Sequence, residues 1–205
     1  SPAATPPVHG GMRVAPAWEW IEGTSFRYRP LIGVLTESPQ RAAQHQVSEQ
    51  LTLRLFGDAG VVVQPEELGR TIYGKPQLRW RRDCAFHHSI SHTGPITVGV
   101  LSEGAIGIDV EVENRRIGVS PPLLMRRMFS TEQEAAACLE RWSLLQLWTI
   151  KEAVLKASGF GLAGGLSNVA LNRQRGSAEC FGQVYGLTLL RWHRYLITIA
   201  AKETV

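Results

Sequence analysis

The chain has 205 residues, of which 44% are hydrophobic and 20% charged, so it can bury a core as one domain or as two small halves. Its net charge of +4 comes mostly from arginine and suits an acidic protein, a nucleic acid or a polyphosphate ligand. The apolar runs are too short to cross a bilayer, and three widely spaced cysteines form neither a disulfide framework nor a zinc cage. These features exclude a membrane-spanning protein and a disulfide miniprotein, and they predict a cytoplasmic protein that does not associate with membranes.

The first part of the chain predicts a lead-in, a helix and short strands. Residues 1–16 are rich in proline, glycine and alanine without periodicity, which is typical of a flexible segment. A strand-like run at 28–35 precedes apolar residues at helical spacing from Ser38, the expected N-cap, to Gly57. Short strand-like segments broken by proline and glycine fill 61–101. We therefore expect an N-terminal α+β half at 17–104.

The second part of the chain predicts a strand, then helices, then strands. Residues 104–112 alternate as a strand, and helical spacing returns after Ser120 and again after Thr131. A long helix is predicted from Leu144 to Ser158, ended by Gly159. Three strand-like runs follow, at 167–171, 183–190 and 195–201. We therefore expect a second α+β half at 105–205, similar to the first in size and content.

Two acidic residues stand in the apolar strand at 106–111. The period of two in a strand places Asp109 and Glu111 on one face, where their like charges repel. A hard cation such as Mg²⁺, which prefers carboxylate, phosphate and water oxygens, would relieve that repulsion. An edge strand whose polar face meets solvent explains the same residues equally well.

The long predicted helix carries a polar stripe. Trp148, Glu152 and Lys156 recur at i, i+4 and i+8 and so share one helix face. An exposed Glu-to-Lys pair is the common explanation of such spacing. Two of the chain's four lysines fall in this helix, however, which favours a functional role.

Two shorter segments offer groups that bind phosphate. Ser91 and His92 close a run with alternating serines, and Lys75 lies in a turn with Gly74 and Pro76. Hydroxyl, imidazolium and ammonium groups all donate hydrogen bonds to phosphate oxygens. Each segment alone is a weak signal, because a lone histidine or a turn lysine is more often structural.

In this order and spacing, the four segments resemble the Sfp-type 4′-phosphopantetheinyl transferase family. The family pattern is G-K-P, then S-H, then G-I-D-x-E, then W-x-x-K-E-A-x-x-K-x-x-G-x-G-L, and it is matched at 74–76, 91–92, 107–111 and 148–162. Residues 128–134 are similar to the family's F-S-x-x-E junction. The run Ser89-Ile90-Ser91-His92 is closer to the enterobactin-synthase-activating branch.

The resemblance implies a fold of two similar α+β halves around a pseudo-twofold axis, with coenzyme A in the cleft between them. It implies transfer of the 4′-phosphopantetheine arm of coenzyme A to a serine of an apo acyl or peptidyl carrier protein, releasing adenosine 3′,5′-bisphosphate. It also implies a monomer that binds Mg²⁺ and no nucleic acid.

The resemblance also assigns roles to residues. Asp109, Glu111 and Glu152 would bind Mg²⁺, Glu152 would also act as general base, and Lys156 would stabilise or protonate the leaving phosphate. The diphosphate would be held by Ser91 and His92, and the nucleotide end would be lined by Lys75 and Pro76. The arginine that many family members carry midway along the first helix has no counterpart among residues 46–50, and Arg41 or Arg54 is the expected substitute.

Two other classes of function remain open. A nucleic-acid-binding module would use the run Arg79-Trp80-Arg81-Arg82 for phosphate contacts and base stacking, but it leaves the Asp109 and Glu111 pair unexplained. A relative that keeps the fold without turnover would have lost a metal-binding or base residue, and none is lost here.

Overall fold

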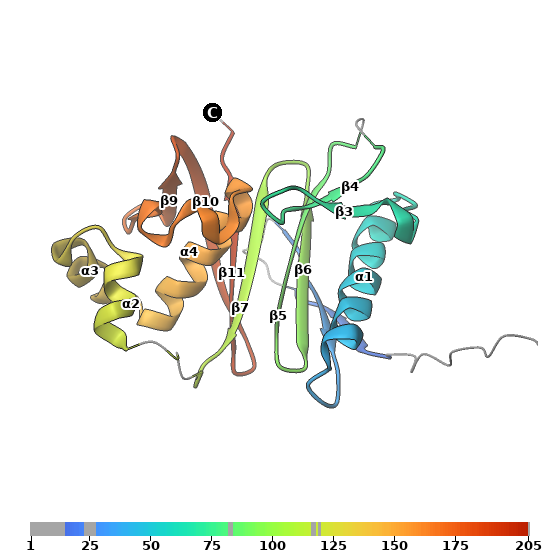
Figure 1. Ribbon diagram of the computed structural model, residues 1–205, viewed down its shortest axis with the longest axis horizontal. Coiled ribbons are helices and arrows are strands. Elements are labelled where there is room, and N and C mark those ends of the chain that lie inside the picture. The colour runs from blue at the N-terminus through green and yellow to red at the C-terminus, as the bar shows by residue number, and fades with distance from the viewer. Residues whose placement is uncertain (1–14, 23–27, 82–83, 116–117, 119, 205) are drawn as a thin grey trace, which may run out of the picture.

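The structure is a computed structural model that describes residues 15–22, 28–81, 84–115, 118 and 120–204 (Figure 1). Most of the predicted lead-in at 1–16 lies outside these described residues. No helix in the described part of the chain is long and apolar enough to span a membrane.

The first half of the chain forms an antiparallel sheet covered by one long helix. The strands lie in the order β1-β2-β6-β5. Their bounds are β1 Ala17–Trp20, β2 Leu31–Val34, β5 His87–Thr93 and β6 Ile96–Ser102. Helix α1, Arg41–Asp58, packs across this sheet and buries Leu51 and Leu55 against Leu31. A one-turn helix, η1 (Pro65–Glu67), leads into a small hairpin of β3 (Leu68–Arg70) and β4 (Pro76–Leu78).

The second half forms a larger antiparallel sheet, in the order β7-β11-β10-β9-β8. Its strands are β7 Ile106–Val112, β8 Ala170–Asn172, β9 Ser177–Cys180, β10 Gln183–Trp192 and β11 Tyr195–Lys202. Helix α4, Leu144–Ser158, packs on β7 and β11. The shorter helices are α2 Pro121–Met128, α3 Glu132–Leu139, η2 Gly161–Gly164 and η3 Leu166–Asn168.

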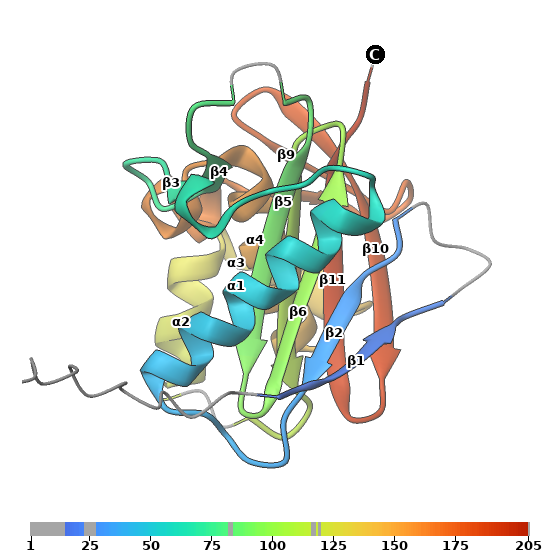
Figure 2. The ribbon, with the colours of Figure 1, turned by 90° about the vertical axis from the view of Figure 1, so that its right-hand side faces the viewer.

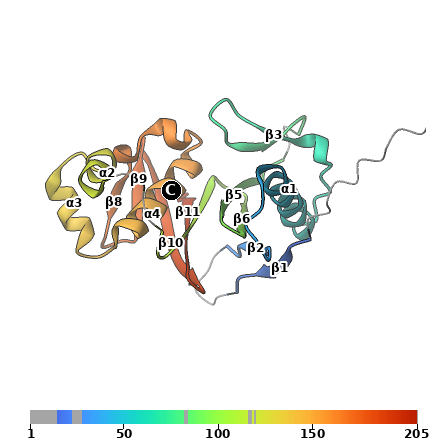
Figure 3. The ribbon, with the colours of Figure 1, turned by 60° about the horizontal axis from the view of Figure 1, so that its bottom comes forward.

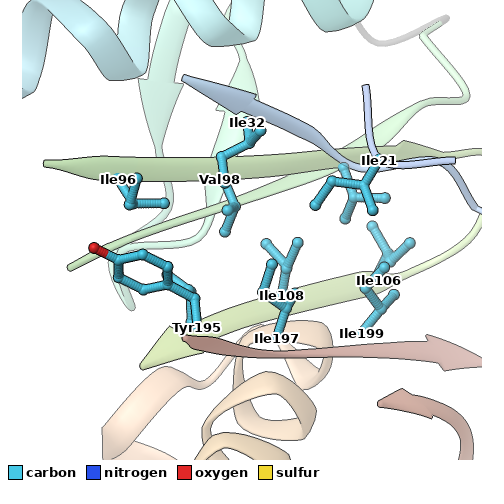
Figure 4. Close-up of a cluster of buried hydrophobic side chains, with 11 residues drawn as sticks. Ile21, Ile32, Ile96, Val98, Ile106, Ile108, Tyr195, Ile197 and Ile199 are labelled. Atoms are coloured by element: carbon cyan, nitrogen blue, oxygen red, sulfur yellow. The ribbon is translucent and has the colours of Figure 1, made fainter. Parts of the chain in front are cut away.

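The main core lies between the two sheets. Ile32 and Val98 of the first sheet face Ile108 and Ile197 of the second, and all four are at most 1% exposed (Figure 4). Helices α1 and α4 cover the outer faces, so the layers run helix, sheet, sheet, helix (Figures 1 and 3). Figure 2 shows α1 lying obliquely across the first sheet. The prediction of an α+β protein with two similar halves is confirmed.

One glycine in each half lets a helix approach its sheet. A Cβ on Gly99 of β6 would clash with Leu51 of α1. A Cβ on Gly107 of β7 would lie 2.6 Å from the backbone nitrogen of Ala157 in α4, and closer still to the carbonyl oxygen of Ala153. Because the Gly107 clash is with backbone atoms, only glycine allows α4 to pack this tightly beside β7.

Several predicted boundaries need correction. Helix α1 begins at Arg41 with Gln40 as N-cap, not at Ser38, because Pro39 and Gln40 are not helical. Strands β1 and β9 were not predicted, since each has only four residues. The first two residues of the strand predicted at 167–171 belong to the one-turn helix η3, and β8 begins only at Ala170. The chain passes from β6 of the first sheet to β7 of the second between residues 102 and 106, so the division at 104/105 stays a prediction.

Candidate active site

The two sheets meet along β5 and β7, which are the edge strands of their sheets. Side chains join them there. Ser91 Oγ donates to Asp109 Oδ1 at 2.9 Å, and Ser89 Oγ accepts from the backbone N–H of Ile108 at 3.0 Å. The alternating serines of the β5 run thus point toward β7 and fix its position relative to the first sheet.

Asp109 and Glu111 lie on one face of β7, as predicted from their spacing. They are 6% and 5% exposed, so the alternative of a polar face meeting solvent is wrong. One oxygen of each, Asp109 Oδ2 and Glu111 Oε2, is buried and makes no hydrogen bond within the described structure. Burial raises the pKa of both carboxyl groups, and for Glu111 the charge of Asp109 raises it further. Two buried acids with unpaired oxygens are costly, which indicates that a cation belongs beside them.

Helix α4 carries the other two charged residues of the site, Glu152 and Lys156. It begins at a capping box, in which Ser143 Oγ accepts from Gln146 N and Gln146 Oε1 accepts from Ser143 N. It ends at Gly159, whose φ of 86° is the left-handed conformation that glycine tolerates. These ends place the stripe with Glu152 and Lys156 alongside β7.

Lys156 reaches across from α4 to both edge strands. Its Nζ donates to Asp109 Oδ1 at 3.2 Å, to Ile108 O at 3.0 Å and to Ile90 O at 3.4 Å. The alternative explanation, an exposed ion pair between Glu152 and Lys156, is therefore wrong for this lysine. Its ammonium group therefore joins the two halves, and its side chain as a whole is 28% exposed.

Glu152 is partly buried close to the strand carboxylates. Burial, followed by the charges of Asp109 and Glu111, raises the pKa of Glu152 to about 7. A carboxyl group with this pKa exchanges a proton near neutral pH, which suits a general base. The predicted roles of Glu152 as base and as metal ligand both remain predictions.

The carboxylate cluster, which consists of Asp109, Glu111 and Glu152, supplies only some of the ligands that a hard cation needs. Within the described residues, no three acidic, histidine or cysteine side chains are arranged to hold a metal ion by themselves. The unpaired oxygens of Asp109 and Glu111 are nevertheless the donor type that Mg²⁺ prefers, and the remaining ligands of this ion are commonly phosphate and water oxygens. The site therefore suits a cation that binds together with a phosphate ligand.

Two adjoining cavities lie on the first-half side of this cluster. The smaller, of about 80 Å³, is lined by Lys75, Pro76 and Lys156 among others, and the larger has about 380 Å³. Arg70, Pro76 and His88 line both. Lys75 Nζ lies 3.2 Å from His87 Nδ1, and burial lowers the pKa of the Lys75 ammonium. The cavities thus carry several cations, which favours an anionic ligand.

The structure places the predicted phosphate-binding residues at three points, which are Asp109, the smaller cavity and the end of β5. Ser91 is buried at Asp109, and Lys75 and Pro76 line the smaller cavity. His92 lies near the end of β5, where partial burial of its ring, followed by the charge of Lys156, lowers its pKa. Arg41 is exposed at the first residue of α1 and lines neither cavity, so the structure gives its predicted role no support.

Sequence reasoning missed two arginines at the larger cavity. Arg70 and Arg79 line it from either side of the β3–β4 hairpin. Arg70 Nη1 donates to Gly74 O at 2.8 Å, so it holds the turn that carries Lys75. The signal that could have found Arg70 is its position four residues before the Gly74-Lys75-Pro76 turn.

Sequence reasoning also left Lys151 without a role. This lysine is 0% exposed, and its Nζ donates to Met128 O at 2.6 Å, Val169 O at 2.7 Å and Leu166 O at 3.2 Å. Burial lowers the pKa of Lys151 to about 8. Lys151 therefore joins the end of α2 and the start of β8 to the helix that carries Glu152.

Comparisons with known proteins agree with this geometry. Residues 105–202 match the family model of the 4′-phosphopantetheinyl transferase superfamily. The chain is 31% identical over 134 residues to slr0495 of Synechocystis sp., which is only provisionally named a 4′-phosphopantetheinyl transferase. It is 32% identical over 100 residues to the 4′-phosphopantetheinyl transferase psf-1 of Bacillus pumilus, and 32% identical over 91 residues to gsp of Aneurinibacillus migulanus, named likewise. These matches cover 62%, 46% and 44% of this chain, but only 54%, 40% and 37% of the relatives' own lengths.

Proposed function

Because residues 105–202 match the family model of the 4′-phosphopantetheinyl transferase superfamily, we propose that the chain transfers the 4′-phosphopantetheine arm of coenzyme A to a serine of an apo carrier protein. Adenosine 3′,5′-bisphosphate is the other product. The observation that carries the proposal is the meeting of Asp109, Glu111, Glu152 and Lys156 where the two sheets join, beside cavities lined by cations.

The metal that this reaction uses fits the unpaired oxygens of the cluster. Asp109 and Glu111 would hold Mg²⁺ through Oδ2 and Oε2, with Glu152 as the third carboxylate. When bound, the ion neutralises charge on the diphosphate as the phosphoanhydride bond breaks.

The chain's own residues supply orientation and proton transfer. Ser91 and Lys156 both bind Asp109 Oδ1, which leaves Oδ2 without a hydrogen-bond partner and available to a metal ion. Lys156, whose side chain is partly exposed, would stabilise the charge that develops on the leaving phosphate. Glu152 would accept the proton of the attacking serine hydroxyl, directly or through water.

The nucleotide end of coenzyme A fits the two adjoining cavities. Lys75 and Pro76 line the smaller one, and His92 lies at the end of β5, where it meets the diphosphate. Arg70 and Arg79, rather than Arg41, supply the cations of the larger cavity. The enterobactin-synthase-activating branch and the monomeric state stay predictions.

The carrier protein, whether acyl or peptidyl, docks at the junction of α2 and α3. A groove of about 840 Å³ lies there, lined by Met125, Phe129 and Ala135 among others. Arg126 and Arg127 lie in the last turn of α2, beside the groove. They give this surface the basic charge that suits an acidic partner. The nucleic-acid alternative is less well supported, because Arg81 binds Glu67 at 2.5 Å and Arg79 lines the cavity.

The proposal is tested with Asp109→Ala in an assay that contains coenzyme A, Mg²⁺ and an apo carrier. Transfer by the wild-type protein should need the divalent cation, and the variant should remain folded but lose transfer. Its fold should survive, because losing Asp109 removes the repulsion with Glu111. Full turnover by a folded Asp109→Ala protein in excess chelator would show that these carboxylates do not serve a metal-dependent reaction.

A further inference from the structure

Arg115 lies beside the carboxylate cluster, in the turn that follows β7. Its backbone N–H donates to Val112 O at 3.0 Å, and its Nη1 forms an ion pair with Glu111 Oε1. The Arg115 side chain is 46% exposed, whereas that of Glu111 is 7% exposed. A half-exposed guanidinium group therefore covers a buried carboxylate from the solvent side.

The two strand carboxylates have matching surroundings. One oxygen of each binds a cation of the chain, Lys156 at Asp109 and Arg115 at Glu111, and the other oxygen is buried and unpaired. With Glu152, three carboxylates share these two cations. The charge of Arg115 also opposes the rise in the pKa of Glu152 that burial causes, so the guanidinium acts on the whole cluster.

We propose that Arg115 is the counter-ion of this cluster in the metal-free protein, and that its charge weakens the binding of a free divalent cation there. The inference rests on the proposed function, in which Asp109, Glu111 and Glu152 hold the metal. A diphosphate brings negative charge of its own and so offsets the charge of Arg115. The cation then binds more tightly together with coenzyme A than alone.

Charge, rather than orientation, is the main effect expected of Arg115. Glu111 lies within a strand, opposite Leu196 of β11, and is nearly inaccessible to solvent, so packing already restricts its side chain. Arg115 is half-exposed and lies in a turn, which makes it a poor support for orientation. A positive charge this close to a divalent cation repels it. We expect this repulsion to outweigh any small gain in metal affinity from the orientation of Glu111.

The test measures Mn²⁺ affinity without coenzyme A or carrier, by titration with electron paramagnetic resonance detection of free Mn²⁺. Arg115→Gln removes the charge, and Arg115→Lys keeps it. Arg191→Gln is the matched control, because Arg191 forms an ion pair with Glu113, close in sequence to the cluster but outside it. Asp109→Ala gives the background of Mn²⁺ bound elsewhere.

Arg115→Gln should bind Mn²⁺ roughly tenfold more tightly than the wild-type protein, given the charge removed. Arg115→Lys and Arg191→Gln should bind it as the wild type does. Urea unfolding in excess chelator should show Arg115→Gln less stable, because Glu111 then stays buried without its cation. These measurements need no transfer, so they are independent of the transfer assay.

Weaker Mn²⁺ binding in both Arg115 variants would show that Arg115 orients Glu111, and it would overturn the proposal. So would equal affinities in the wild type and Arg115→Gln, or Mn²⁺ binding that Asp109→Ala leaves intact. A tighter Arg115→Gln site in a protein that transfers nothing to any carrier would leave the inference standing and refute the proposed function instead.

Discussion

Replacing Glu152 by glutamine should stabilise the metal-free protein, by an amount that depends on pH. Burial and the charges of Asp109 and Glu111 raise the pKa of Glu152 from 4.5 to about 7. Between these values the unfolded chain has an ionised Glu152, while the folded protein keeps it protonated. The folded state then binds more protons, so the free energy of unfolding falls as the pH rises through this window.

The difference between the two pKa values corresponds to a change of about 3 kcal/mol in the free energy of unfolding. Above about pH 7, Glu152 is ionised in the folded and in the unfolded protein. The wild-type protein has then lost this contribution to its free energy of unfolding. Glutamine carries no charge at any pH. Glu152→Gln should therefore match the wild type near pH 4.5 and exceed it in stability above pH 7.

Urea unfolding in excess chelator from pH 4.5 to pH 8 measures this difference, and Glu103→Gln at an exposed position is the control. Adding Mg²⁺ should stabilise the wild type more than Glu152→Gln and so reduce the gap. A difference between the two proteins that stays constant with pH, or that grows toward low pH, would refute the idea that burial and the neighbouring carboxylates raise the pKa of Glu152.

Four further outcomes follow from the packing and charges. Lys151→Met should lower the free energy of unfolding by about 2–5 kcal/mol in urea titrations, because it leaves buried carbonyl oxygens without their donor. Gly107→Ala should be destabilised by at least about 2 kcal/mol and should impair transfer, since its Cβ would meet the backbone of α4. Lys156→Ala should slow turnover more than it weakens coenzyme A binding by calorimetry, and unchanged turnover would contradict its role. Charge reversal at Arg126 and Arg127 should raise the carrier KM and reduce its salt dependence, whereas an unaffected KM would show that docking is apolar.

Local patterns predicted the elements that carry the chemistry. The capping residue Thr131 placed the start of α3, and the apolar period of 144–158 with the stop at Gly159 placed both ends of α4. Alternation placed Asp109 and Glu111 on one face of a strand. These features are short-range, since a few neighbouring residues determine them.

Features that depend on long-range packing could not be predicted. The burial of the Asp109 face arises because β5 and α4 cover an edge strand that a periodicity argument would leave in solvent. Lys156 is ordinary in a helical pattern, and only its contacts with Ile90 and Ile108, far away in sequence, give it a structural role. Arg70 and Arg79 reach the cavity because the β3–β4 hairpin packs beside α1 and β5, which the local turn signal does not indicate.

The most direct test of the proposed reaction is the intact mass of an apo carrier protein after incubation with this chain, coenzyme A and Mg²⁺. The carrier should gain the mass of one 4′-phosphopantetheine group, and one adenosine 3′,5′-bisphosphate should be released per carrier modified. A carrier whose acceptor serine is replaced by alanine should gain nothing. Acyl and peptidyl carriers that all keep their mass, while the folded protein binds coenzyme A and Mg²⁺, would contradict the proposed transfer.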